Sequence, residues 1–168
     1  MQPRRLLLIR HATAAGGPID ADRPLTGTGV EHAQAIGTWL ARAELTPDRV
    51  LVSPARRVAQ TWENAGAQLS SGPQPIADPR IYDNTVEQVL ATIREAPDDA
   101  LTVAVVGHNP SIRELAAALD DGRGSPEALR ALERGFPAAG VAVFVLPGSF
   151  AATAPGAATL TDFTVPGV

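Results

Sequence analysis

Apolar residues follow two alternating patterns along this chain. Mainly apolar runs of strand length occur at 6–9, 49–52, 101–106 and 141–146. Between them, apolar residues recur every three or four positions in stretches that cover 26–43, 53–69, 86–93 and 110–119. The first pattern is typical of strands buried on both faces of a sheet, and the second is typical of amphipathic helices. Their alternation predicts an α/β fold around a mostly parallel sheet.

Capping residues mark where the predicted helices begin. Thr26 is the expected N-cap of the first helix, and Ser53 precedes a proline at the first helical position of the second. Asn109 stands in the same relation to Pro110. A short helix at 127–133 and an edge strand at 159–165 complete the pattern. Since 168 residues are about one domain's worth, we expect a single domain over 1–168.

Three of the predicted strands lead directly into basic or imidazole side chains. Arg10 and His11 follow the first strand, Arg57 comes soon after the second, and His108 follows the strand at 101–106. The carboxyl ends of parallel strands line one shared crevice, so we expect these four side chains to meet. They are the candidate site.

The residue types in this cluster point to phosphate chemistry. The forked donors of Arg10 and Arg57 match the oxygens of a phosphate, and a neutral imidazole is a competent nucleophile. The neighbouring guanidinium charges disfavour imidazolium, which helps to keep His11 unprotonated. His108 fits the role of hydrogen-bond donor to the transferred group better than that of a second nucleophile.

Composition excludes several other classes of protein. The formal net charge of −4 disfavours a general nucleic-acid binder, and the absence of cysteine removes disulfides and thiol catalysis and fits a cytoplasmic location. The apolar run at 6–9 stops too early for a signal peptide, and no stretch is long enough to cross a membrane. Neither zinc-type spacing nor a nucleotide-binding glycine motif is present, so we expect no metal and no cofactor.

Four segments together resemble a known family. They are Leu8-Ile9-Arg10-His11, Arg23-Pro24-Leu25-Thr26, the stretch from Ser53-Pro54 to Gln60-Thr61, and Val106-Gly107-His108-Asn109-Pro110. In these segments the chain resembles the histidine phosphatase superfamily, whose members include the phosphoglycerate mutase-like proteins. It is most similar there to the SixA-type phosphohistidine phosphatases.

The resemblance implies a fold and a site. The fold is a three-layer α/β/α sandwich, and the reaction passes through a phosphohistidine on His11, with Arg10, Arg57 and His108 forming the phosphate pocket. Asn109 and Thr13 are further candidates for substrate binding. The chain has alanine after His11 where many members have glycine, and Thr13 stands where relatives often carry a charge.

The general acid is the least defined part of the expected site. Mutase-like relatives place a glutamate after the third strand, and Asp83 is the best positional match. Protonation of a leaving group needs a carboxylic acid within hydrogen-bond reach and with a raised pKa. The alternative is that Asp83 and Asn84 form a turn before the next helix.

We therefore predict a cofactor-independent phosphatase that acts on phosphohistidine in a phosphorelay protein. Two alternatives stand beside it: a phosphatase for a small phosphomonoester, and a non-catalytic protein that binds phosphate or docks a partner. The expected partner is a phosphate-bearing substrate, with neither nucleic acid nor membrane. No sequence feature indicates an oligomeric state.

Overall fold

The computed structural model describes residues 2–82 and 84–168. Their centre is a six-stranded sheet in the order β3-β2-β4-β1-β5-β6. The strands are β1 (Arg4–Arg10), β2 (Arg49–Val52), β3 (Ile76–Ala77), β4 (Thr102–Gly107), β5 (Val141–Leu146) and β6 (Thr159–Thr164). Strands β1 to β4 pair in parallel, while β5 is antiparallel to both β1 and β6. The predicted mostly parallel sheet is confirmed.

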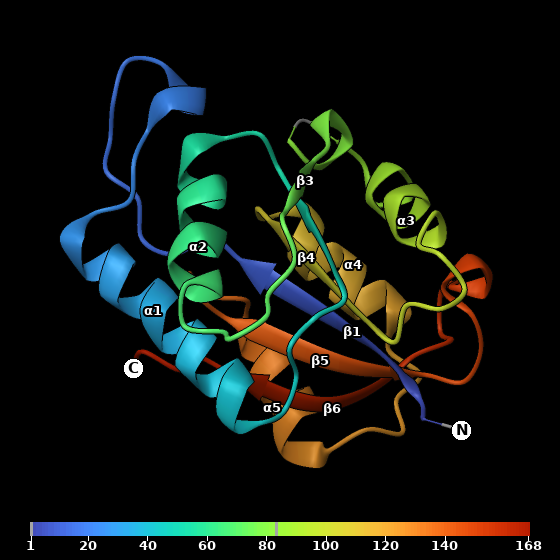
Figure 1. Cartoon of the computed structure of the whole chain (residues 1–168). Coiled ribbons are helices and arrows are strands. Elements are labelled where there is room, and N and C mark those ends of the chain that lie inside the picture. The colour runs from blue at the N-terminus through green and yellow to red at the C-terminus, as the bar shows by residue number, and fades with distance from the viewer. Residues whose placement is uncertain (1, 83) are drawn as a thin grey trace.

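Helices cover both faces of this sheet (Figure 1). They are α1 (Gly27–Arg42), α2 (Arg56–Gly66), α3 (Val86–Arg94), α4 (Ser111–Leu119) and α5 (Pro126–Arg134). Alternate residues of β1 separate two cores: Leu6 and Leu8 pack with apolar residues of α3, α4 and α5, whereas Leu7 and Ile9 pack with those of α1 and α2. The architecture is therefore the three-layer α/β/α sandwich that was predicted.

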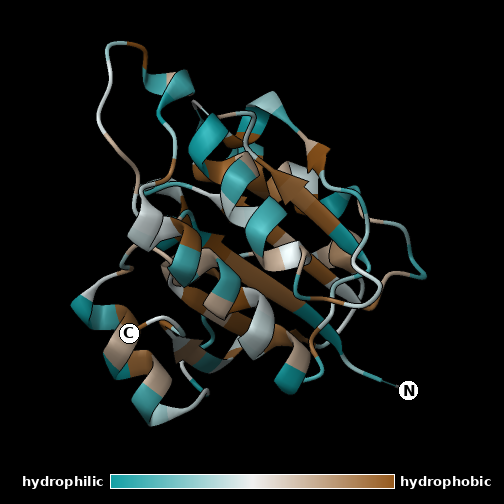
Figure 2. Cartoon of the chain, turned by 60° about the vertical axis from the view of Figure 1, so that its left-hand side comes forward, coloured by the Kyte–Doolittle hydropathy of each residue, from teal (hydrophilic) through white to brown (hydrophobic). Residues whose placement is uncertain are grey.

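The hydropathy of the elements explains this layering (Figure 2). Strand β4 is buried at every residue, as is expected of a central parallel strand with helices on both sides. Helix α2 carries its buried residues at 57, 58, 61, 62 and 65, which is one face of a helix. Each helix thus buries one stripe, and in α2 this stripe includes the charged residue Arg57.

Two predicted helix starts are wrong. Helix α2 begins at Arg56 with Ala55 as its N-cap, and α4 begins at Ser111 with Pro110 as its N-cap. Ser53 and Asn109 lie before these helices, and both make tertiary contacts that are described below. Polar residues just before a helix are usual caps, but here their side chains have partners elsewhere in the fold. The Thr26 cap is confirmed, since its hydroxyl accepts from the Gly29 amide.

The remaining differences are small. Leu101 lies outside β4 and is exposed, and the region before Tyr82 forms only the two-residue β3 and a 3-10 turn at Pro79–Ile81. His32 of α1 is half-buried, and Gly167 of the C-terminal tail lies against it. In the described part of the chain, no helix combines the length and the apolar character needed to span a membrane.

Candidate active site

The four predicted site residues lie together at the carboxyl ends of β1, β2 and β4. Arg10 ends β1 and pairs with Gly107 at the end of β4, so His11 and His108 extend from neighbouring strands. The centres of the two imidazole rings are 5.5 Å apart. Arg57, in the first turn of α2, donates to His108, which brings the third strand end into the same cluster. The crevice at the strand ends therefore holds two imidazoles and two guanidinium groups.

The environment of His11 leaves one ring nitrogen available for reaction. Its Nδ1 lies 2.7 Å from the backbone oxygen of Ala12. A carbonyl only accepts, so Nδ1 carries the proton and Nε2 keeps its lone pair. Burial lowers the pKa of His11 from 6.5 to about 4, and the charges of Arg57, Arg10 and Arg23 add to this, while the bond to Ala12 opposes it. The ring is therefore neutral at pH 7.

A buried hydrogen-bond chain holds the backbone beside His11. The amide of Ala12 donates to the Thr61 hydroxyl over 3.0 Å, and that hydroxyl donates to the carbonyl of Arg57 over 2.7 Å. This chain connects the loop after β1 to the first turns of α2. Ala12, which stands where many family members have glycine, is fully buried at this position.

Arg57 is buried, and both of its terminal nitrogens make hydrogen bonds. Its Nη1 donates to the backbone oxygen of Asp20 over 2.8 Å, and its Nη2 donates to the Asp20 carboxylate over 3.1 Å and to His108 Nδ1 over 3.2 Å. The loop between β1 and α1 thus supplies an anion to this guanidinium. A phosphate that binds Arg57 would either replace the Asp20 carboxylate or bind beside it.

The contacts of His108 define its tautomer. A guanidinium only donates, so Nδ1 of His108 accepts from Arg57 and its Nε2 carries the proton. Nε2 lies 2.7 Å from the hydroxyl of Ser53, which is completely buried. Burial first, and then the charge of Arg57, lower the pKa of His108 to about 4. In this arrangement His108 is neutral and donates to Ser53.

Arg10 precedes His11 at the end of β1, and its charge acts on the His11 ring. Its Nη1 donates to the backbone oxygen of Phe136 over 3.0 Å, and its buried Nε has no hydrogen-bond partner among the described residues. Asn109 donates through Nδ2 to the same Phe136 oxygen over 2.9 Å. The loop before β5 therefore orients both side chains through one backbone oxygen, that of Phe136.

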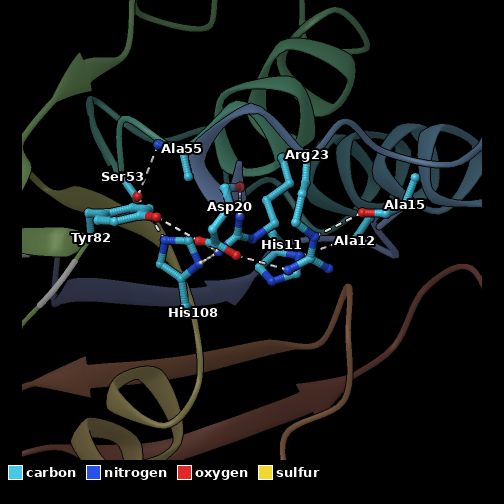
Figure 3. A network of polar contacts seen from close by, with 10 residues as sticks. His11, Ala12, Ala15, Asp20, Arg23, Ser53, Ala55, Tyr82 and His108 are labelled. Carbon is cyan, nitrogen blue, oxygen red and sulfur yellow. Dashed lines mark hydrogen bonds and ion pairs between the residues drawn. The ribbon is translucent and has the colours of Figure 1, made fainter. Parts of the chain in front are cut away.

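Three residues that were assigned no role from the sequence complete the site (Figure 3). The Asp20 carboxylate accepts from the Tyr82 hydroxyl over 2.6 Å and from Arg23 over 3.0 Å, besides Arg57. The ring of Tyr82 meets the ring of His108 edge-on, with centroids 5.6 Å apart. Arg23 also donates to the backbone oxygen of Ala15. The sequence pointed to this loop through Arg23-Pro24-Leu25-Thr26, a segment that resembles the family and that includes neither Asp20 nor Tyr82.

The weaker site predictions have mixed outcomes. The side chain of Thr13 is exposed, while its backbone oxygen accepts from Thr26 at the start of α1. Asn109 binds the Phe136 carbonyl, as described, and does not cap α4. Asp83 lies outside the described residues. In the part of the chain that the structure describes, no three acidic, histidine or cysteine side chains are grouped as metal ligands would be.

These features define the class of protein. An α/β sandwich that brings a neutral imidazole and two guanidinium groups together at its strand ends is suited to phosphoryl transfer, and the protein is a phosphatase. The chain belongs to the histidine phosphatase superfamily: the model of branch 1 of that superfamily matches residues 6–84.

Individual relatives agree with this family. The phosphohistidine phosphatase SixA of Escherichia coli is 30% identical over 125 residues, which are 73% of this chain and 78% of the relative. A structure from Nakamurella multipartitia, assigned to phosphohistidine phosphatase SixA, is 36% identical with a TM-score of 0.85, covering 99% of this chain and 98% of that one. A protein histidine phosphatase SixA in complex with tungstate is 26% identical, with a TM-score of 0.79 and coverage of 96% and 97%.

More distant proteins share the same fold. A phosphoglycerate mutase from Plasmodium falciparum is 17% identical with a TM-score of 0.66, and the match covers 99% of this chain and 93% of that one. At that identity the likeness concerns the fold alone. The predicted phosphoglycerate mutase-like architecture is confirmed.

Proposed function

We propose that this protein removes phosphate from a phosphohistidine of a phosphorelay protein and forms a phosphohistidine on His11 during turnover. The observation that carries the proposal is the orientation of His11, with Nδ1 donating to a carbonyl and a free lone pair on Nε2 beside two arginines. The similarity to SixA-type phosphohistidine phosphatases supports the choice of substrate. A cytoplasmic location fits such a substrate.

In the first step, His11 takes the phosphoryl group. Arg10 and Arg57 bind the phosphate oxygens, where negative charge is spread in the transition state. Nε2 of His11 forms a bond to phosphorus as the bond from phosphorus to the substrate imidazole breaks. A substrate ring that carries a proton on its other nitrogen leaves directly as neutral histidine, while the positive charge passes to the phosphorylated His11 ring.

In the second step, water attacks the phosphorus of the phosphohistidine intermediate. The bond to His11 Nε2 breaks, inorganic phosphate forms, and the ring returns to its neutral state. The hydrogen bond from Nδ1 to Ala12 holds the ring in one orientation through both steps. The two arginines bind the phosphate oxygens in both steps.

One observation favours phosphohistidine over a phosphomonoester. An alkoxide leaving group needs a general acid far more than an imidazole does. The described carboxylate nearest to the cluster is that of Asp20, and its hydrogen bonds with Tyr82, Arg23 and Arg57 hold its pKa well below its usual range. Asp20 is therefore ionised at neutral pH and has no proton to give.

The test compares two substrates and two variants. Hydrolysis of a phosphohistidine-bearing protein is measured beside that of an aryl phosphate, for the wild type, His11→Ala and Asp83→Asn. We expect His11→Ala to abolish both activities and the acid-labile phosphoenzyme, while Asp83→Asn keeps the turnover of phosphohistidine.

Other results lead to the alternatives. Equal losses in both variants would make Asp83 a general acid and favour a small phosphomonoester. A wild type without turnover, which does not become phosphorylated but gains thermal stability from phosphate, would instead be a phosphate-binding protein.

A further inference from the structure

A groove of about 520 Å³ lies beside the candidate active site. It is bounded by the start of α4, the end of α5, the loop that follows α5 and the end of β6. Its apolar part is formed by Phe136, Pro137, Phe163 and Val165. The rings of Phe136 and Phe163 meet edge-on with centroids 5.0 Å apart and form an aromatic wall, in which Phe136 is buried and the half-buried Phe163 presents the accessible surface.

The groove adjoins the cluster of Arg10, His11, Arg57 and His108. Phe136 lines the groove, while its backbone oxygen accepts from both Arg10 and Asn109. Asn109 lines the groove as well and directly follows His108. A polypeptide that presents a phosphorylated side chain to His11 therefore has this groove within reach of its neighbouring residues.

The charged residues of the groove are both basic. Arg113 and Arg134 line it and are exposed, and no acidic side chain is among the described residues that line it. Arg113 donates to a backbone oxygen, that of Glu133, and neither arginine takes part in an ion pair in the described part of the chain. In a chain with a net charge of −4, two arginines without a carboxylate partner are a local basic surface.

We propose that this groove binds the polypeptide around the phosphohistidine of the substrate protein and selects acidic and apolar residues there. The inference rests on the proposed function and names the surface of the partner that fits. His11 and His108 are each less than a tenth exposed, so a projecting side chain reaches them while the rest of the partner lies outside the pocket. Carboxylates of the partner pair with the two arginines, and an apolar side chain packs against the aromatic wall.

The test uses two synthetic phosphohistidine peptides that differ only in their flanking residues. One has glutamate and leucine beside the phosphohistidine, and the other has lysine and leucine. For the wild type, kcat/KM is expected to be higher for the glutamate peptide, and the ratio of the two values should fall as salt rises. In the double variant Arg113→Ala/Arg134→Ala the ratio should fall about 10-fold, the order of magnitude of two exposed ion pairs.

Two further variants complete the design. Arg113→Glu/Arg134→Glu should reverse the preference in favour of the lysine peptide. Arg42→Ala removes an exposed arginine at the far end of α1, and the ratio should stay as in the wild type.

Failure of the inference differs from failure of the proposed function. If the wild type hydrolyses both peptides at equal rates, or if the double variants keep the wild-type ratio, the groove does not bind the partner. If the wild type hydrolyses an aryl phosphate but neither peptide, the phosphohistidine function is wrong, and the inference falls with it.

Discussion

The buried hydroxyl of Ser53 bonds the His108 ring and so affects which ring nitrogen carries the proton. In this structure Nε2 of His108 donates to Ser53 and Nδ1 accepts from Arg57. To donate to a phosphate through Nδ1, the ring has to carry its proton there, and Nε2 then needs a donor. A hydroxyl both donates and accepts, so Ser53 can serve the ring in either state.

Ser53→Ala removes this partner and leaves a ring nitrogen of His108 unsatisfied in a buried site. We expect kcat for hydrolysis of the phosphorylated substrate to fall about 10-fold, because an unpaired buried polar group costs of the order of 1 to 3 kcal/mol. Ser53→Thr keeps the hydroxyl and should restore most of the rate. A loss of thermal stability in Ser53→Ala with an unchanged kcat would show that the hydroxyl has only a structural role.

At the scale of elements, the contact between α1 and α2 sets the position of the arginine. A Cβ atom at Gly37 of α1 would lie 2.0 Å from the backbone oxygen of Ala65 in α2. Glycine is thus required for the two helices to lie so close, and α2 carries Arg57 in its first turn.

Gly37→Ala should therefore lower the free energy of unfolding by about 1 to 3 kcal/mol, the usual cost of overpacking. Gly27→Ala is the matched control, since nothing lies within 4 Å of a Cβ atom there and alanine is the better helix former. Urea denaturation of both variants gives the measurement. Equal stability of the two variants would contradict the close contact.

At the scale of the whole molecule, the buried imidazoles link stability to pH. Burial lowers the pKa of His11 and of His108 from 6.5 to about 4. Between these values the unfolded chain binds more protons than the folded one, so the free energy of unfolding rises with pH. The contribution of the two neutral rings to stability is lost as pH falls from 6.5 toward 4.

Thermal unfolding between pH 4 and pH 8 measures this dependence, on the background of the acidic groups that titrate at the lower end. His108→Gln removes one of the two groups, so the free energy of unfolding should change less steeply with pH between pH 5 and pH 6.5. Each pKa unit corresponds to about 1.4 kcal/mol of stability. A wild-type stability that is constant down to pH 5 would show that the two rings titrate normally.

Most elements could be predicted because their signals are local. The strand at 141–146 and the helix at 26–43 follow from the spacing of apolar residues within each segment. The two helix starts at Ser53 and Asn109 were wrong: Ser53 accepts from the Ala55 amide ahead of α2 and also bonds His108, while Asn109 donates to the Phe136 carbonyl, so neither side chain caps the first turn of a helix. Tertiary contacts override local preferences at such places.

The sequence by itself determined the α/β class and the four residues of the cluster. Strand ends that carry arginine and histidine are visible in the chain, and parallel strands bring such ends together. Only the tertiary structure decided what surrounds them: the contacts of Asp20 with Arg57 and Tyr82, the tautomer of His108, and the basic groove beside Phe136. These depend on residues from separate parts of the chain, whose distances and orientations are set when the layers pack and have no counterpart in local spacing.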